Sequence, residues 1–318
     1  MLQSKVSMEE SKMGGGRWSS DSWSSFTRDY SSKKTTEIYS SRKLDLDLDP
    51  KGIKIRESRD SEDNPNSNAI IIGLDVTGSM SSVLDAMARM GLNALVTNIY
   101  DRKPVSDPHI MCMGIGDVEY DRAPLQVTQF EADIRIAQQL EKLYLEQGGG
   151  GNSYESYTFA WYFAAMHTSI DCFEKRNKKG YLFTIGDEEP TPKLAMDAIK
   201  KVMGEGPQVD LTDQDLFTMA SRQYDIFHVM VEEGSHFRNH GDRVVEKWTR
   251  LLGQRAVRLS DHTKFAETVV SLIQVNEGVS RDDVIKSWDG TTSLVIGKAL
   301  ESMSVEKVET NGGLVVFD

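Results

Sequence analysis

The sequence predicts an α/β protein built on a doubly wound, mostly parallel sheet, with helices on both faces and one antiparallel edge strand. The runs Ile70–Leu74, His109–Ile115 and Gly180–Ile185 are largely apolar, as is typical of strands that are covered on both faces. Segments with a helical spacing of apolar residues separate these runs. Such alternation of strands and helices needs crossover connections and therefore favours parallel pairing.

Residues 1–42 are rich in Ser, Lys, Thr and Gly, a composition that buries too little apolar surface to offset the entropy of ordering. The segment nevertheless contains five spaced aromatic residues: Trp18, Trp23, Phe26, Tyr30 and Tyr39. We expect an arm that is disordered in the isolated protein. Trp18 and Trp23 are expected to become ordered only against a partner or a second copy of the chain.

Residues 43–68 are expected to form an edge strand, a hairpin and a linker. Leu44–Asp49 alternates strictly between Leu and Asp, which predicts an edge strand with one acidic face. A calcium-binding loop is excluded here, because Pro50 and Arg56 stand where that loop needs Gly and Glu. Ile53–Ile55 would continue the hairpin, and the polar residues 58–68 would be the linker.

Residues 69–277 are expected to form one domain of alternating strands and helices. Its expected strands are 70–74, 109–115, 125–130, 180–185, 225–231 and 256–259, and its expected helices are 83–95, 134–145, 154–166, 192–203, 213–222, 242–252 and 264–275. Residues 125–130 follow a turn that contains a proline, so they would pair antiparallel with the strand before them. Residues 278–318 are expected to be a helical or strand extension, with Leu314–Phe317 as a late strand or a docking peptide.

The composition is that of a soluble globular protein, with 39% hydrophobic and 27% charged residues among 318. The net charge of −12 opposes a role in coating nucleic acid. The sequence contains no apolar run near 18 residues and no secretory signal, so we expect neither a membrane span nor export. Cys112 and Cys172 lie in apolar segments and are expected to be reduced core residues of a cytoplasmic protein.

Three oxygen-bearing side chains follow the first apolar strand at intervals of two residues: Asp75, Thr77 and Ser79. Ligands of open α/β sheets bind beyond the carboxyl ends of the strands, so these side chains lie where a site is expected. One carboxylate and two hydroxyls suit Mg²⁺ or Mn²⁺, hard cations that prefer oxygen ligands. A cation held by so little negative charge would attract one more anionic oxygen. The alternative is an ordinary strand-to-helix turn with a capping Ser.

The segment Asp75-Val-Thr77-Gly-Ser79 resembles the metal-ion-dependent adhesion site of von Willebrand factor A domains, whose motif is Asp-x-Ser/Thr-x-Ser. The resemblance covers about two thirds of the chain and is closest to the A domains of bacteria and their phages. It implies the doubly wound fold and a metal-dependent protein-binding function without enzymatic activity. The implied partner offers an acidic side chain to the metal. The alternative function that the resemblance implies is that of an accessory subunit of an AAA+ ATPase, which would be a separate protein because this sequence has no Walker motif.

The resemblance also implies the remaining ligands. Asp187 follows a later buried strand and matches the family's third loop. The second loop usually supplies a Thr after a pair of glycines, but here Asn152 and Ser153 follow the glycine run. Either residue can offer a neutral oxygen, directly or through water.

Further carboxylates flank these positions. Asp117 ends the strand beside the first one and is expected to line the rim of the site. Glu155 is a further candidate for the rim or second shell of the site, although capping of the helix that follows it is the simpler role. Glu188 and Glu189, in the turn after Asp187, are expected to be solvated charges.

Three other kinds of site are less consistent with the residues. A Mg²⁺-dependent phosphohydrolase of the haloacid dehalogenase type needs an acid two residues after its nucleophile, and position 77 is Thr. Zinc binding by His236, His240 and Asp242 is disfavoured, because no Cys accompanies them in their polar segment. RNA binding, as in the Ro autoantigen, would need helical repeats that this sequence lacks.

Overall fold

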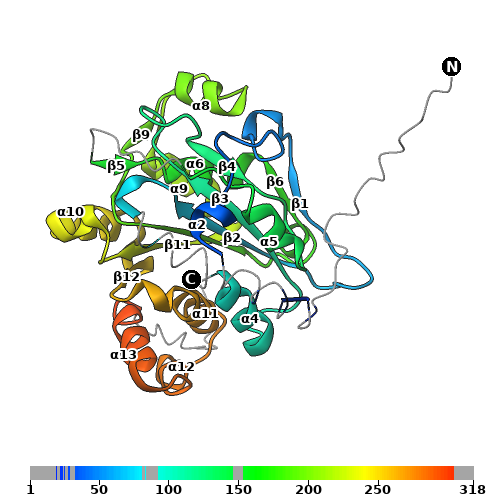
Figure 1. Cartoon of the computed structure of the whole chain (residues 1–318), viewed down its shortest axis with the longest axis vertical. Helices are drawn as coiled ribbons and strands as arrows, with labels where there is room; N and C mark the ends of the chain where they lie inside the picture. Colours follow the sequence, from blue (N-terminus) through cyan, green and yellow to red (C-terminus); the bar gives the residue numbers. More distant parts are fainter. Residues whose placement is uncertain are drawn as a thin grey trace, which may run out of the picture.

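The computed structural model describes residues 33–80, 92–145 and 153–303, together with Ser19, Ser22, Trp23, Ser25, Arg28 and Val83. Its centre is a six-stranded sheet (Figure 1). In spatial order the strands are β12 (Ala256–Leu259), β11 (Tyr224–Val231), β7 (Gly180–Gly186), β2 (Asn68–Asp75), β3 (Pro108–Ile115) and β4 (Leu125–Val127). The first five are mutually parallel, and β4 runs antiparallel to β3, which confirms the predicted antiparallel edge strand.

The alternation of side chains along β2 divides the interior into two cores. Ile70 and Ile72 belong to one cluster of buried apolar residues, and Ala69 and Ile71 belong to the other. Successive side chains of a strand point to opposite faces of its sheet, so a strand that is apolar throughout has to be covered on both sides. The mixed α/β class with helices flanking a mostly parallel sheet is therefore as the sequence predicted.

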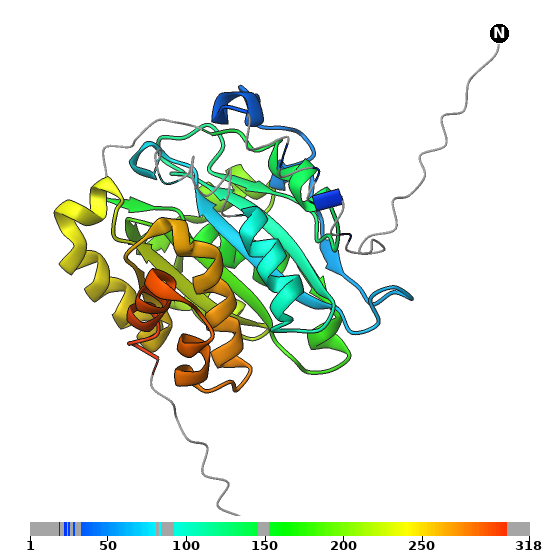
Figure 2. The same ribbon diagram turned by 60° about the horizontal axis from the view of Figure 1, so that its bottom comes forward.

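The helices divide between these two faces (Figures 1 and 2). The first cluster is covered by α4 (Leu92–Arg102), α5 (Arg135–Leu140), α11 (Phe265–Asn276), α12 (Arg281–Lys286) and α13 (Gly290–Ala299). The second is covered by α6 (Thr158–Met166), α8 (Met196–Met203), α9 (Asp213–Ala220) and α10 (Ser235–Leu252). Figure 2 shows α4 and α11 side by side in front of the sheet, where they are in contact.

Short elements complete the architecture. Three two-stranded sheets pair β1 (Arg56–Ser58) with β6 (Thr168–Ile170), β5 (Tyr154–Glu155) with β8 (Glu189–Pro190), and β9 (Lys193–Leu194) with β10 (Leu211–Thr212). The short helices are α2 (Thr35–Ile38), α7 (Asp171–Glu174), η1 (Pro50–Gly52), η2 (Gly78–Met80), η4 (Gly253–Arg255) and η5 (His262–Lys264).

The predicted edge strand at Leu44–Asp49 is wrong, because these residues form a turn. The Asp45 side chain accepts a hydrogen bond from Asp47 N (2.9 Å), and the Asp49 side chain caps η1 by accepting from Lys51 N (3.0 Å). Short acidic side chains bond readily to nearby backbone amides, and this competes with a strand ladder. Leu48 is buried, and its carbonyl accepts from Val127 N, so the turn covers the edge of β4.

Part of the N-terminal segment belongs to the core. Trp23 is 3% exposed and packs in the first apolar cluster together with Ile38 and Tyr39. The expectation that Trp23 orders only against a partner is therefore wrong. A large aromatic side chain gains enough from burial to hold a polar segment on the domain. Trp18 lies outside the described residues.

Residues 58–68 are tied to the domain by ion pairs and hydrogen bonds. Arg59 pairs with Asp171 of α7 (2.9 Å), and Asp60 pairs with Arg176 (2.7 Å). These contacts accompany the parallel pairing of β1 with β6, so the predicted hairpin at 53–55 gives way to a parallel strand that begins at Arg56.

Several predicted helices differ from the observed ones in their ends. The helix expected at 154–166 begins at Thr158, after β5, and the one expected at 192–203 begins at Met196, after β9. The helix expected at 134–145 ends at Leu140, whereas α10 begins at Ser235 and is kinked at His240.

The predicted C-terminal helices are present, because α12 and α13 pack on the first core. Leu314–Phe317 lies outside the described residues. Within the described part of the chain, no helix combines the length and apolarity needed to cross a bilayer.

Candidate functional site

The carboxyl ends of β2 and β7 bring two acidic side chains to the middle of the sheet edge. Asp75 is the last residue of β2, and Asp187 follows the last residue of β7. The two strands are paired, with Leu74 opposite Ile185, so their ends lie side by side. Both aspartates are fully buried. The carboxylates of Asp75 and Asp187, both expected from the sequence at a binding site, therefore lie at neighbouring strand ends.

The carboxylate of Asp75 is held by three hydrogen bonds. Its Oδ1 accepts from Thr77 N (2.9 Å) and from Thr77 Oγ1 (2.6 Å), which fixes the turn after the strand. Its Oδ2 accepts from the hydroxyl of Tyr157 (2.8 Å). Thr77 is thus in contact with Asp75. Ser79 lies in η2, and the structure describes its backbone only.

Tyr157 connects the first and third loops of the site. Besides donating to Asp75, its hydroxyl accepts from the backbone N–H of Glu188 (3.3 Å). Gly186 makes this possible, because a Cβ at that position would overlap the Tyr157 hydroxyl. Sequence analysis missed Tyr157, since an aromatic residue before an apolar helix is ordinarily core.

Asp187 is held against the start of α10. Its Oδ2 accepts from the backbone N–H of His236 (2.8 Å), which belongs to the first turn of that helix. Gly234, directly before the helix, lies so close that a Cβ there would overlap the Asp187 side chain. The backbone amides at a helix N-terminus lack partners within the helix, and the Asp187 side chain satisfies one of them at the start of α10.

Two further carboxylates are buried beside this pair. Pairing of β5 with β8 places Glu155 opposite Pro190, and Glu155 and Glu188 are 2% and 9% exposed. The Oε2 atom of each is buried and has no hydrogen-bond partner among the residues that the structure describes. The prediction that Glu188 is a solvated charge is wrong. The expected helix-capping role of Glu155 is also wrong, because α6 begins three residues later and Tyr157 takes its N-cap position.

The electrostatics reflect crowding of carboxylates in a buried space. Burial, followed by the charge of Asp187, raises the pKa of Asp75 to about 7 against the hydrogen bonds from Thr77 and Tyr157. Burial and the charge of Asp75 likewise raise the pKa of Glu188 to about 8 and that of Glu155 to about 11. A bound cation reverses this effect by stabilising the ionised carboxylates, so the donor set fits a metal ion.

The remaining predicted residues have different environments. Asp117 is buried at the end of β3, where its Oδ1 accepts from Glu119 N (2.7 Å). Its charge raises the pKa values of Glu155 and Glu188, which is consistent with a place at the rim. Ser153 is half-buried just before β5, and Asn152 lies outside the described residues.

Glu189 does not contribute free negative charge to the site. It is buried and forms ion pairs with Arg243 and Lys247 of α10, so its predicted solvated position is wrong. His236, also of α10, has its Nδ1 3.9 Å from Glu188 Oε1. Burial lowers the pKa of His236 below its usual value, which opposes a positive charge there.

A second group of potential metal ligands lies at the ends of β11 and β12: Glu233, Asp261 and His262. Glu233 Oε2 lies 2.6 Å from His262 Nδ1 and accepts from His262 N (2.7 Å), and Asp261 Oδ1 accepts from Thr263. These bonds account for the cluster without an ion. Sequence analysis missed it, although acidic residues follow both strands within two positions.

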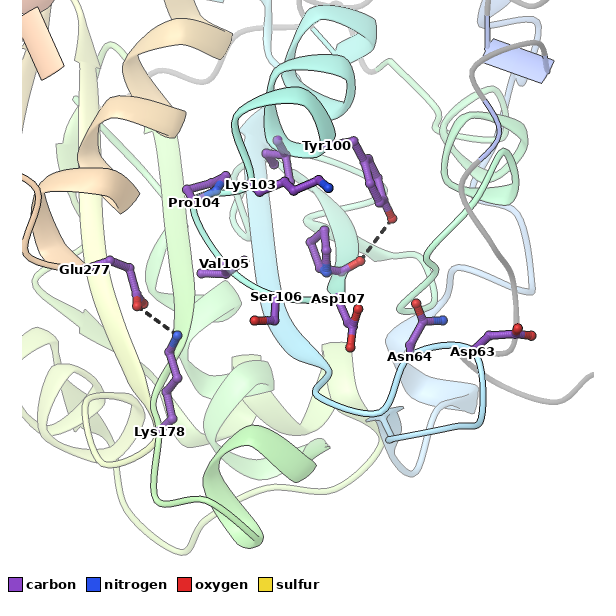
Figure 3. A pocket seen from close by; sticks show the side chains of 12 residues that line it. Asp63, Asn64, Tyr100, Lys103, Pro104, Val105, Ser106, Asp107, Lys178 and Glu277 are labelled. Carbon is purple, nitrogen blue, oxygen red and sulfur yellow. Dashed lines mark hydrogen bonds and ion pairs between the residues drawn. The ribbon is translucent and has the colours of Figure 1, made fainter. Parts of the chain in front are cut away.

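The opposite edge of the sheet contains a cavity of about 520 Å³ near the amino end of β3 (Figure 3). Its charged lining is largely paired: Lys178 forms an ion pair with Glu277 (2.9 Å), which also accepts from Tyr181 (2.6 Å). Tyr100 donates to the carbonyl of Pro108 (3.2 Å). The carboxyl edge is therefore the stronger candidate, because the Oε2 atoms of Glu155 and Glu188 are buried there with no hydrogen-bond partner among the described residues.

No family model matches the sequence, and no curated protein matches it. Solved structures that resemble the fold include two of the pilus adhesin SpaC from Lactobacillus rhamnosus GG, one of them in an open conformation. They are 12% and 13% identical, with TM-scores of 0.44 and 0.41. The matches cover 74% of this chain but only 31% and 32% of the adhesin, so the chain spans about a third of its length.

Proposed function

We propose that the protein is a metal-dependent protein-binding module of the von Willebrand factor A type. Asp75, Thr77, Ser79 and Asp187 would hold Mg²⁺ or Mn²⁺, with Asn152 or Ser153 supplying a neutral oxygen. The observation that carries the proposal is the juxtaposition of two fully buried carboxylates, Asp75 and Asp187, on neighbouring strands.

The topology supports the same location. Numbered along the chain, the six strands have the spatial order 3-2-1-4-5-6. The strands that follow β2 in sequence are first added on one side of it and then, from β7 onward, on its other side, so the strand order changes direction between β2 and β7. Ligands of doubly wound sheets bind at this switch point, beyond the carboxyl ends of the strands. Asp75 and Asp187 stand on either side of it.

The module would act by offering its cation to an acidic side chain of a partner protein. An AAA+ ATPase is one such partner that the family resemblance implies. The buried, free Cys112 and Cys172 support our further proposal that the protein works in a reducing compartment, the cytoplasm.

Isothermal titration of Mg²⁺ and Mn²⁺ tests the proposal. The wild type should bind one cation, whereas Asp75→Asn and Asp187→Asn should each lose most of the affinity. Asp197→Asn, which removes an exposed carboxylate on α8, should bind as the wild type does. Equal binding by all four proteins would contradict the proposal, and steady phosphatase turnover would favour the phosphohydrolase alternative.

A further inference from the structure

Another cavity of about 520 Å³, here called the η1 cavity, is lined by η1 with the turn before it, by residues 121–125 and by the last turn of α8. Its lining contains three cationic side chains, Lys51, Arg122 and Lys201. Within the described part of the chain, none of the three forms an ion pair or a side-chain hydrogen bond. Unpaired positive charge gathered in one cavity is unexpected in a chain whose net charge is −12.

A cavity of about 580 Å³, lined in part by α5, also contains three cations and provides a comparison. There, Lys142 pairs with Asp47 (2.7 Å) and Arg135 pairs with Glu131 (2.9 Å). The third cation, Arg56, donates to the carbonyl of Asp47 (2.7 Å). The cations of that cavity therefore have partners within the protein, whereas those of the η1 cavity are available to a ligand.

Lys51 is held at the cavity by its neighbours. The Asp49 side chain accepts from Lys51 N (3.0 Å) and caps η1, which begins at Pro50. The stem of the Lys51 side chain lies against Gly204, the C-cap of α8, where a Cβ would come within 3.1 Å of Lys51 Cγ. Packing of the stem leaves the charged end of a lysine in water. It brings Lys51 to the same helix end as Lys201.

Two carboxylates, Asp49 and Asp121, also line the cavity, and each accepts a hydrogen bond from the backbone. The Asp121 side chain accepts from Asp117 N (2.7 Å), and Asp121 N donates to the Asp117 carbonyl (2.8 Å). These bonds fix the turn that carries Arg122. Three cations and two such carboxylates leave positive charge in excess, so the cavity favours an anion.

The remaining lining residues are apolar: Leu44, Pro50, Pro124, Leu125 and Val202. The volume of the cavity lies within the range of about 300–1,000 Å³ that is usual for sites of small molecules. A ligand that matches both parts of the lining has an anionic group for the cations and a compact apolar group for the other residues.

We propose that the η1 cavity binds a small phosphate monoester with an apolar organic group. A phosphate monoester carries about −1.5 to −2 charges at pH 7 and has three strong acceptor oxygens, so it can meet three cations at once. A carboxylate offers one charge and two oxygens. Arginine binds phosphate through paired N–H groups, and lysine binds it as a point charge. This site is separate from the cation site proposed at Asp75 and Asp187.

Isothermal titration of the full chain with phenyl phosphate tests the ligand class. The wild type should bind one molecule. Inorganic phosphate, which lacks the apolar group, and benzoate, which lacks the second charge and the third oxygen, should each bind at least about five-fold more weakly. Equal binding of inorganic phosphate overturns the apolar part of the proposal, and equal binding of benzoate overturns the choice of a phosphate.

Substitutions of single cations test the location. Lys51→Gln, Arg122→Gln and Lys201→Gln should each weaken binding of phenyl phosphate by about five-fold or more. Lys200→Gln is the matched control, because Lys200 is an exposed cation of the same helix turn that does not line the cavity. It should change the affinity by less than about two-fold. All four side chains are exposed, so the variants should fold, which circular dichroism checks.

Two results would overturn the η1 cavity as a site. If Lys200→Gln weakens binding as much as Lys201→Gln does, the ligand responds only to the overall charge of the surface. If phenyl phosphate does not bind the wild type at millimolar concentrations, the cavity does not take this class of ligand. Neither result bears on the proposed metal-dependent function, which the titrations of Asp75→Asn and Asp187→Asn decide.

Discussion

The Tyr157 hydroxyl donates to Asp75 Oδ2 and accepts from Glu188 N, so one side chain joins the ends of two neighbouring strands. Tyr157→Phe should keep the aromatic packing and lose both bonds. We expect the free energy of unfolding, measured with urea, to fall by about 1–3 kcal/mol. Tyr120→Phe, at an exposed position, should leave it within about 0.5 kcal/mol.

The close approach of Gly234 to Asp187 gives a second prediction. Gly234→Ala should lower the free energy of unfolding by about 2 kcal/mol or more, because the new methyl group meets a side chain that α10 holds in place. Gly52→Ala is the matched control, since a Cβ there meets nothing within 4 Å. If the two variants are equally stable, the Asp187 side chain is able to move and make room for the new methyl group.

Glu131 links stability to pH away from the proposed site. Burial raises its pKa to about 7 from an ordinary value of 4.5, although Arg135 opposes the shift. The folded state therefore binds the proton more tightly than the unfolded state. The stabilisation from this group is complete below about pH 4.5 and is lost as the pH rises to about 7.

The Glu131→Gln variant has no titrating group at this position. The free energy of unfolding of the variant minus that of the wild type should therefore increase as the pH rises. We expect a rise of about 1–3 kcal/mol between pH 5 and pH 8. Urea unfolding at several pH values measures it, with the exposed Glu205→Gln as control. A difference that is constant over this range would show that Glu131 is ionised throughout.

Burial of Trp23 gives a prediction for the N-terminal segment. Trp23→Ala should reduce the free energy of unfolding by about 3–5 kcal/mol and lower the melting temperature, since it leaves a cavity in the first core. Leu46→Ala, at a side chain that is 85% exposed, should have little effect. An unchanged melting temperature for Trp23→Ala would restore the view of residues 1–42 as an arm outside the fold.

The sheet could be predicted from the sequence because its strands are apolar on both faces. Ile70–Leu74 and Gly180–Ile185 have only one environment that suits them, and both strands were placed within two residues of their observed ends. Asp75 and Asp187 followed from the same signal, since each stands directly after such a run.

The parts that could not be predicted depend on side-chain hydrogen bonds or on pairing between distant segments. Leu44–Asp49 has the alternation of a strand, yet the Asp45 and Asp49 side chains accept hydrogen bonds from nearby backbone amides, which favours a turn. The burial of Glu155 results from pairing of β5 with β8, two-residue strands with no pattern of their own. Tyr157 contributes two hydrogen bonds through its hydroxyl. The spacing of apolar residues gives no information about hydrogen bonds of this kind.

The pairing of β1 with β6 has a consequence for synthesis of the chain. The two strands, and the ion pair of Arg59 with Asp171, join segments that are 112 residues apart. At a translation rate of roughly 5–20 residues per second, β1 leaves the ribosome roughly 6–20 s before its partner does. During that interval the apolar residues of β2 are already synthesised, but β7, beside them in the finished sheet, is not. The emerging chain therefore carries β2, which is buried along its whole length in the finished fold, without one of its two neighbouring strands until residue 186 has been added. Exposed apolar strands of this kind are prone to aggregation, so we expect chaperone binding to matter most at this stage of synthesis.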